Sequence, residues 1–193
     1  MPHNVVVLLL GYAGSGKLTI AQHLAARIDA RIVDNHWINN PILALLDSAA
    51  DIDPLVWDET DKVRGAVMET IARYVPAGLS FIFTYCAFEG DADDLRSYQL
   101  MRTTAERRAA VFVPVRILCS EEELVRRVVT PERAKRLKST SAARAIAERR
   151  ARAVLDPRHP DQLTLDVSAL SAAESAAAIE RHVCAVSQRD RSR

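Results

Sequence analysis

The chain has 193 residues, a length that fits one compact domain. Hydrophobic residues make up 49% of it and charged residues 26%, an ordinary balance for a globular protein. The 26 basic and 25 acidic residues nearly cancel, which argues against nucleic acid or a membrane as the main partner. The three cysteines are widely spaced and odd in number, so the sequence indicates neither a disulfide framework nor a zinc site.

The sequence gives no sign of a membrane span or of an export signal. It contains no run of about 18 or more apolar residues, the length that a spanning helix needs. The apolar run Asn4–Leu10 is too short for the core of a signal peptide, and a glycine-rich segment follows it in place of a cleavage site. We therefore expect a cytoplasmic monomer or homodimer whose cysteines are small, buried apolar thiols.

The first half of the chain alternates between short apolar runs and amphipathic segments. A continuous apolar run is typical of a strand buried on both faces, as in a parallel sheet. An Asp-Pro pair, present at Asp53-Pro54, is typical of a helix start. In chain order the predicted elements are the strand Asn4–Leu10, the helix Lys17–Ile28, the strand Arg31–Val33 ending at Asp34, a helix from Pro54 to about Tyr74, and the strand Leu79–Tyr85.

The second half continues the alternation. Ser120 with Glu123, and Ser171 with Glu174, have the spacing of capping boxes that open helices. The predicted elements are the helix Ala92–Arg108, the strand Val111–Leu118, a helix from Ser120 towards Val129, the strand Leu163–Val167, and a helix from Ser171 to about Val186. This alternation predicts a single α/β domain over residues 1–187 with a parallel sheet covered on both faces, followed by a flexible tail at 188–193.

The segment Gly11–Lys17 satisfies the pattern G-x-x-x-x-G-K, with a buried strand before it and an amphipathic helix after it. Glycines let the backbone curl so that successive N–H groups point at one anion, and the new helix adds its positive end. Lys17 would place an ammonium against the β- and γ-phosphates of ATP or a close relative. The residues expected to contact the nucleotide in this segment are Gly11, Ala13, Gly14, Ser15, Gly16, Lys17, Leu18 and Thr19.

One residue departs from the usual form of this motif. Leu18 stands directly after Lys17, where a metal-binding hydroxyl is usual, and Thr19 follows one position later. We expect Thr19 to help hold Mg²⁺, the cation that accompanies ATP. The departure separates the chain from switch-type GTPases, which carry a hydroxyl beside the lysine.

The loop GYAGSGKLT, the segment Asp34-Asn35-His36 and the later RRVVTPERAKRLK resemble the adenylate kinase and shikimate kinase group of P-loop kinases, most closely a shikimate-kinase-like branch. The resemblance covers about residues 4–186, and small kinases of this group often read G-K-x-T. It implies a three-layer fold with a five-stranded parallel sheet of order 2-3-1-4-5. It also implies a mobile lid at about residues 130–142 and an acceptor site over the carboxyl ends of the second and third strands.

Six basic residues cluster around Pro131, in the region of the implied lid. Phosphoryl transfer spreads negative charge over the phosphate oxygens, and guanidinium groups on a closing loop can stabilise that charge and exclude water. A solvated basic helix face is the alternative interpretation. The resemblance implies that Arg126 or Arg127 lies against adenine and that Arg133 reaches the transferring phosphate. The cluster consists of Arg126, Arg127, Arg133, Lys135, Arg136 and Lys138.

The acceptor side is less sharply defined by the sequence. Asp34 ends the second strand and faces the crevice where open α/β sheets bind ligands, so it is a candidate base or a water-mediated metal partner. His36 is the other candidate base, since imidazole accepts protons near neutral pH. Turn chemistry is the alternative for Asp34-Asn35. No carboxylate directly follows the third strand, and Glu89 or Asp91 would either orient magnesium through water or, for Asp91, cap a helix.

Several further residues have two interpretations. Three aromatic residues would either line an acceptor pocket or belong to the core: Trp37, Trp57 and Tyr85. Three asparagines are candidates for hydrogen bonds to acceptor hydroxyls: Asn35, Asn39 and Asn40. Asp156–Pro160 is predicted to form a rigid turn, and the loop Ser168–Ser171 lies where relatives contact adenine.

The leading hypothesis is an ATP-dependent kinase with Lys17, Asp34, His36 and Arg133 as catalytic candidates. It would move the γ-phosphate to a small-molecule acceptor, either to a hydroxyl or to a nucleotide phosphate. A regulatory ATP-binding NTPase and a toxin-like kinase are the alternatives.

Overall fold

The protein is built around one parallel β-sheet. The structure, a computed structural model, describes residues 3–46, 52–130 and 140–192. Five strands pair in the order β2-β3-β1-β4-β5, which confirms the order that the resemblance implied. All residues of β1 are buried at the centre of the sheet, which explains the continuous apolar run in the sequence. The strands are β1 (Val5–Gly11), β2 (Ala30–Asp34), β3 (Ser80–Tyr85), β4 (Val111–Leu118) and β5 (Leu163–Asp166).

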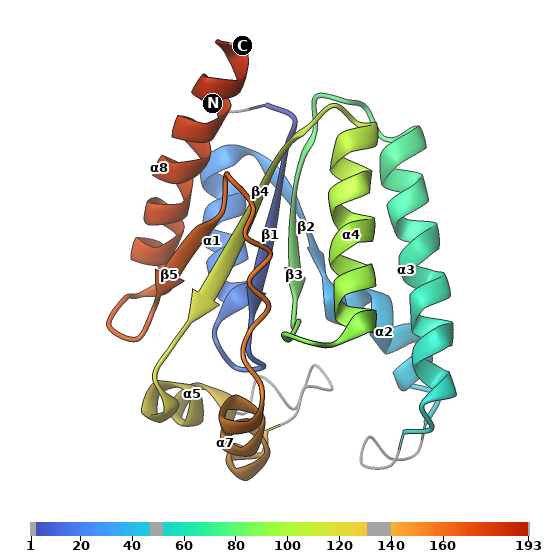
Figure 1. Ribbon diagram of the computed structural model, residues 1–193, viewed down its shortest axis with the longest axis vertical. Helices are drawn as coiled ribbons and strands as arrows, with labels where there is room; N and C mark the ends of the chain where they lie inside the picture. Colours follow the sequence, from blue (N-terminus) through green and yellow to red (C-terminus); the bar gives the residue numbers. More distant parts are fainter. Residues whose placement is uncertain (1–2, 47–51, 131–139, 193) are drawn as a thin grey trace.

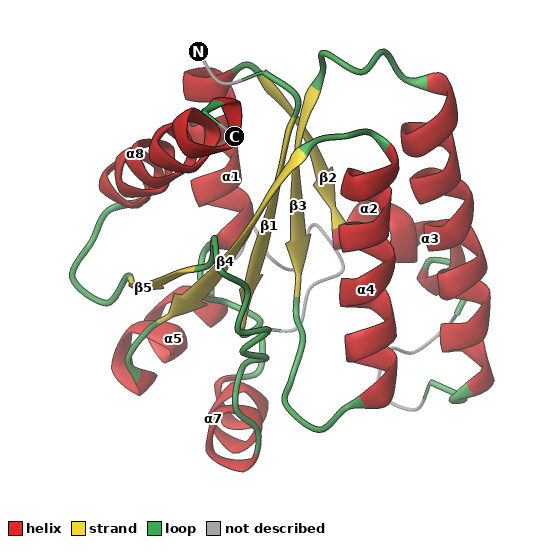
Figure 2. Cartoon of the chain, turned by 45° about the horizontal axis from the view of Figure 1, so that its top comes forward, coloured by secondary structure: helices red, strands yellow, loops and turns green. Residues whose placement is uncertain are grey.

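Helices cover both faces of the sheet and give the expected three layers (Figures 1 and 2). Helices α1 (Lys17–Ile28) and α8 (Ala172–Arg191) pack together on one face. Helices α3 (Leu55–Tyr74) and α4 (Ala92–Arg107) pack together on the other. The core between these layers is built from aliphatic side chains and a few aromatic rings. Among the described residues, no helix combines the length and the apolar character needed to cross a membrane.

Two described helices were not predicted. Helix α2 (Asn35–Leu43) begins directly after β2, where turn chemistry was the alternative considered, and it contains Pro41. Helix α7 (Ala142–Ala151) follows the predicted lid region, and the Ser141 hydroxyl accepts from Arg144 N at its start. With α5 (Glu121–Val128), α7 lies beyond the carboxyl ends of β4 and β5 (Figure 1).

The predicted helix starts at two serines have different outcomes. Ser171 forms the complete capping box with Glu174. Ser120 caps α5 by accepting from Glu123 N, but no reciprocal bond from the Glu123 side chain is present. Its carboxylate instead accepts hydrogen bonds from Arg126 and Arg127, because the two guanidinium groups are stronger partners than one backbone amide.

The end of the chain also differs from the expectation. Helix α8 continues to Arg191, beyond the end predicted near Val186. Polar side chains in its last turns do not end it, and Ser187 Oγ donates to Val183 O within the helix. The segment 131–139, which carries most of the predicted lid and Arg133, lies outside the described residues.

Candidate active site

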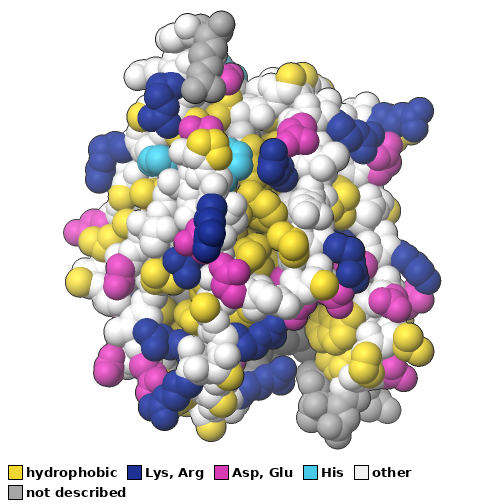
Figure 3. Space-filling view, in the orientation of Figure 1, with side chains coloured by type: hydrophobic (Ala, Val, Ile, Leu, Met, Phe, Trp, Pro, Cys, Tyr) yellow, Lys and Arg dark blue, Asp and Glu magenta, His cyan; other side chains and the backbone are white. Residues whose placement is uncertain are grey.

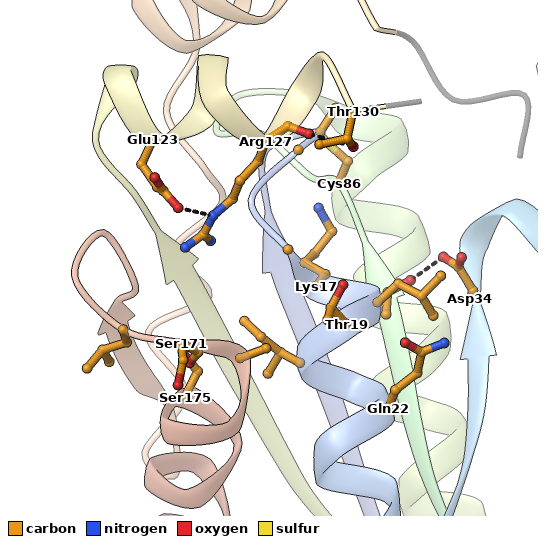
Figure 4. A pocket seen from close by; sticks show the side chains of 18 of the residues that line it. Lys17, Thr19, Gln22, Asp34, Cys86, Glu123, Arg127, Thr130, Ser171 and Ser175 are labelled. Carbon is orange, nitrogen blue, oxygen red and sulfur yellow. Dashed lines mark hydrogen bonds and ion pairs between the residues drawn. The ribbon is translucent and has the colours of Figure 1, made fainter. Parts of the chain in front are cut away.

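A cavity of about 730 Å³ opens at the carboxyl edge of the sheet. Residues that follow β1, β2, β3 and β5 meet α5 around it, so segments far apart in the sequence share one space. Ala13, Gly14, Gly16 and Leu18 line it, whereas Gly11 and Ser15 are buried and do not line it. Other predicted site residues that line the cavity are Lys17, Thr19, Asp34, His36, Arg126 and Arg127. Figure 4 shows Lys17, Thr19, Asp34 and Arg127 among them.

The loop after β1 takes its shape from glycines in the left-handed region. Gly14 has φ 95° and Gly16 has φ 91°, values that residues other than glycine rarely adopt. Gly16 is also the N-cap of α1, and Ser15 N donates to Tyr12 O at 3.1 Å. A Cβ on Gly14 would lie 3.2 Å from Leu124 Cδ1, so the loop packs closely on α5. The loop and α5 therefore form one wall of the cavity.

Lys17 projects over this loop at the start of α1. Its ammonium donates to Gly11 O and Tyr12 O, both at 2.7 Å, which folds the side chain back along the loop. Beside it, Leu18 is partly buried and Thr19 is exposed, and both line the cavity. A cation and the N-terminus of a twelve-residue helix thus point into the same space. This arrangement suits a polyphosphate.

Arg126 and Arg127, which the sequence could not distinguish, have different surroundings. Both pair with Glu123, but the Arg126 side chain is 73% exposed and that of Arg127 only 20%. Arg127 also donates from Nη1 to Ser15 O and from Nη2 to Val167 O, both at 3.0 Å. All three nitrogens of its guanidinium are therefore held by protein oxygens in the plane of the group. Arg127 joins the glycine-rich loop to the β5–α8 connection.

Glu123 anchors this arginine pair. Hydrogen bonds from Arg126 and then Arg127 lower the pKa of its carboxyl to about 2, so it stays ionised at any ordinary pH. The β5–α8 connection completes this end of the cavity with Ser168–Ser171. Ser168 Oγ accepts from Ser120 N at 2.7 Å and donates to Asp166 Oδ1 at 2.5 Å. These bonds fix the connection against the start of α5.

The opposite end of the cavity is built where β2 and β3 end. Asp34 is 3% exposed, and its Oδ1 accepts from Thr84 Oγ1 at 2.6 Å. Thr84 is its direct partner in the parallel register of the two strands. Asp34 and Thr84 both line the cavity. Asp34 lies on the side of Lys17 away from Arg127 (Figure 4). The predicted carboxylate at the end of the second strand is thus accompanied by a hydroxyl that the sequence analysis did not single out.

Helix α2 brings Asn35 and His36 to the same end of the cavity. His36 Nδ1 lies 3.4 Å from Asn40 Oδ1, on the next turn of the helix. Asn39 is 6% exposed and does not line the cavity, because its Oδ1 lies 3.3 Å from Arg64 Nη2 on α3. Of the three predicted asparagines, Asn35 lines the cavity and Asn39 and Asn40 do not.

Arg64 is a residue that the sequence analysis missed. It is 3% exposed and donates to Asn35 Oδ1 at 2.5 Å and to Asp61 Oδ1 at 3.2 Å. The guanidinium carbon also lies 4.9 Å from the centre of the Tyr85 ring, and that ring lines the cavity. Its position on α3, one turn after Asp61, gave no sequence signal, because arginine in a helix is usually solvated.

The remaining candidates lie elsewhere. Trp37 is 58% exposed and Trp57 43% exposed, and neither lines the cavity, so both the pocket and the core interpretations of these two residues are wrong. Asp91 caps α4 by accepting from Asp93 N and Asp94 N, and it pairs with Arg152. Glu89 accepts from Asp156 N in the predicted turn before β5. Neither acid lines the cavity.

One thiol belongs to the cavity wall. Cys86 follows β3, and burial, partly offset by the nearby Lys17 charge, raises its pKa to about 11. Burial likewise raises the pKa of Tyr85 to about 12, although Arg64 acts in the opposite direction. Both groups therefore stay protonated at neutral pH. The three cysteines are free. Cys119 is buried, but Cys86 and Cys184 are only partly buried, so the expectation of three buried thiols is not met.

Comparison with solved structures finds this fold in several kinases. A gluconokinase from Sinorhizobium meliloti shares 17% identity, with a TM-score of 0.59 over 98% of this chain and 94% of that chain. APS kinase of Mycobacterium tuberculosis, solved with AMPPNP and APS, shares 18% identity, with a TM-score of 0.58 over 95% of this chain and 99% of that chain. Shikimate kinase from Acinetobacter baumannii, solved with shikimate, shares 15% identity, with a TM-score of 0.57 over 94% and 93% of the two chains.

The chain has the fold of the P-loop small-molecule kinases. No protein-family model and no curated protein matches it. At such low identity the likeness shows the fold alone, and the chemistry depends on the residues that line the cavity.

Proposed function

We propose that this protein is an ATP-dependent phosphotransferase that moves the γ-phosphate of ATP to a hydroxyl of a small-molecule acceptor. One observation carries the proposal: the glycine-rich loop with Lys17 and the Asp34–Thr84 pair line the same cavity. A nucleotide bound at the loop would present its last phosphate towards that pair. The kinase identity of the structural neighbours supports the same class of reaction.

On the donor side, the loop amides, Lys17 and the start of α1 would bind the phosphates. We assign the contact with adenine to Arg127. Its nitrogens are occupied in the plane of the guanidinium, so the face of the group is the part suited to stack on a nucleobase. The Ser168–Ser171 connection would border the base from the other side.

We also propose that the segment between α5 and α7 closes over the transferring phosphate and that Arg133 stabilises its charge there. The flanking helices support this assignment, since α5 lines the cavity and α7 packs against α5 (Figure 2). Basic side chains gather on the surface over α5 and α7 (Figure 3), and they include the exposed Arg126 and Arg150. A concentration of positive charge at this edge would attract a polyanionic donor.

The cavity fits a magnesium ion that arrives with ATP. Among the described residues, no group of three or more His, Cys, Asp and Glu side chains could hold a metal by itself. Mg²⁺ is ordinarily bound by one or two carboxylates together with substrate phosphates and water, all hard oxygen ligands. Asp34 and Thr19 both line the cavity and would supply such oxygens, whereas Leu18 supplies none. When bound, the ion would neutralise charge on the phosphate oxygens.

On the acceptor side, Asp34 is our first candidate for the group that accepts the proton of the acceptor hydroxyl. The bond from Thr84 fixes its carboxylate at the cavity wall, which general-base catalysis requires. His36 lines the same wall and is the second candidate. Comparing the variants Asp34→Asn and His36→Asn separates the two assignments, since the true base loses turnover by about 100-fold or more while ATP still binds.

The test of the function is ADP release with ATP and magnesium against a library of hydroxyl-bearing metabolites and antibiotics. We expect at least one acceptor to raise ADP release well above the rate without acceptor, and Lys17→Ala to abolish that increase. Slow hydrolysis that no acceptor changes would favour a regulatory NTPase instead.

A further inference from the structure

We infer that the acceptor is an uncharged or cationic polyhydroxy compound, such as a sugar, a cyclitol or an amino derivative of either, and not a carboxylate or a phosphate ester. This inference rests on the proposed function, because it concerns the acceptor end of the same cavity. It follows from the side chains that form that end and from the hydrogen bonds of Arg64, a guanidinium of the described residues that lies beside it.

The two ends of the cavity differ in charge. The basic residues among its described lining are Lys17, Arg126 and Arg127, and they belong to the loop and to α5. The end formed by β2, β3 and α2 carries the Asp34 carboxylate together with amide, imidazole and hydroxyl groups. The polar lining of that end consists of Asp34, Asn35, His36, Thr84 and Tyr85, together with Gln22 from α1.

Arg64 is the guanidinium that would otherwise serve an anionic acceptor, and it is already committed. Nε donates to Asp61, Nη1 to Asn35 and Nη2 to Asn39, so each nitrogen has a protein oxygen as partner. Its face lies against Tyr85. The Asp61 carboxylate compensates its charge, and the side chain is nearly buried behind Asn35. Arg64 is therefore a positioning residue that orients the Asn35 amide at the cavity wall.

An acceptor entering this end would meet the Asp34 carboxylate together with amide, hydroxyl and imidazole groups. A carboxylate or phosphate on the acceptor would be repelled by Asp34, and among the described residues at this end it would gain a guanidinium only by breaking the Arg64 network. Hydroxyl groups suit amide, carboxylate and hydroxyl partners without that cost, because each can both donate and accept. An amino group would gain directly from the nearby Asp34.

The experiment compares acceptors that share a carbon skeleton and differ in charge: a polyol or aldose, the matching aldonate, and the matching amino sugar, with inositols, aminocyclitols and nucleosides as further sets. Binding is measured without ATP by tryptophan fluorescence, and turnover by ADP release. The chain has only two tryptophans, Trp37 and Trp57, which lie on α2 and α3, the helices that carry Asn35 and Arg64. We expect the neutral or amino member to exceed the anionic member by about tenfold or more in affinity and in kcat/KM.

The two readouts separate failure of this inference from failure of the proposed function. Binding of a neutral or cationic member without any acceptor-dependent ADP release would sustain the inference and remove the kinase assignment. Preferred binding or phosphorylation of an anionic member would overturn the inference and leave the kinase assignment in place. Failure of every neutral and cationic member to bind would overturn the inference as well.

A substitution on α3 tests the role of Arg64 without removing it. Asp61→Asn takes away the carboxylate that compensates the Arg64 charge, so the relative KM of the anionic member should fall by about threefold. Asp58→Asn, three residues earlier on the same helix, is the matched control, since Arg64 pairs with Asp61 and not with Asp58. An equal change in both variants, or none in Asp61→Asn, would contradict the assignment of Arg64 as a charge that the protein has compensated.

Discussion

The Thr84 hydroxyl donates a 2.6 Å hydrogen bond to Asp34 Oδ1, and the two residues are register partners at the ends of β3 and β2. The sheet itself therefore sets the position of the carboxylate. Because neighbouring strands hold both groups, the carboxylate has little freedom to turn away from the cavity. A base or metal partner placed in this way needs no help from a loop.

Replacing Thr84 by Val should impair turnover more than nucleotide binding. The change removes the hydroxyl donor but keeps the shape of the side chain, and a hydrogen bond to a charged group contributes roughly 1.5–3 kcal/mol. We expect kcat to fall by about tenfold or more with little change in the KM for ATP. Thr84→Ser keeps the donor and should retain most of the activity. A Thr84→Val enzyme with parental kcat would show that the bond does not orient Asp34 for catalysis.

Arg127 and Arg126 should contribute differently to nucleotide binding. We expect Arg127→Ala to raise the KM for ATP about tenfold more than Arg126→Ala does, because Arg127 is held flat between the loop and the β5–α8 connection while Arg126 is largely exposed. The ratio of ATP to GTP turnover should also fall in the Arg127 variant. Equal effects of the two substitutions would contradict our choice between them.

The backbone of the glycine-rich loop leaves no space at Gly11. A Cβ there would lie 2.7 Å from Ile117 O and 2.9 Å from Ser15 Oγ, so a backbone atom would have to move. Gly11→Ala should lower the free energy of unfolding by about 1–3 kcal/mol and weaken ATP binding. Gly65 on α3 is the matched control, since nothing lies within 4 Å of its Cβ position. Gly65→Ala should raise the free energy of unfolding by about 0.5–1 kcal/mol, as measured by urea denaturation.

Cys86 provides a test of where ATP binds. Burial raises the pKa of its thiol to about 11, so the reactive thiolate is scarce at neutral pH and increases as the pH rises towards that value. Alkylation by iodoacetamide, followed by peptide mass spectrometry, should be slow at neutral pH and accelerate steadily up to about pH 10. ATP with magnesium should protect Cys86 but not Cys184, which lies on α8 outside the cavity. Equal protection of both thiols, or none, would argue against the nucleotide position.

The sequence predicted most of the sheet because the strands that are buried on both faces carry an unmistakable apolar pattern. The phosphate loop was predicted for a related reason. Its backbone geometry requires glycines, and their positions can be seen directly in the sequence. The strand order came from the family resemblance alone, because apolar runs state which segments are strands but not which ones pair.

Helix α2 could not be predicted from local pattern. Its segment contains three asparagines and Pro41, which are poor helix formers, and the carboxyl end of β2 favours turn chemistry. The helix forms in its tertiary context, where the Asn35 and Asn39 amides accept from Arg64 on α3. The same long-range bonds explain why Arg64 was missed. Helix α7, by contrast, has a detectable signal in the sequence, namely the Ser141 cap and the Ala- and Arg-rich run that follows it.

The central claim, that one cavity binds ATP and presents it to an acceptor near Asp34, is tested most directly by following the transferred phosphate itself. Phosphorus NMR of a reaction with ATP, magnesium and the best acceptor would show whether the γ-phosphate signal moves to a phosphate ester of the acceptor. We expect ester and ADP to appear in equal amounts with the parent protein, and no ester with Lys17→Ala or Asp34→Asn. Inorganic phosphate in place of the ester, or ester formation that survives both substitutions, would contradict the account.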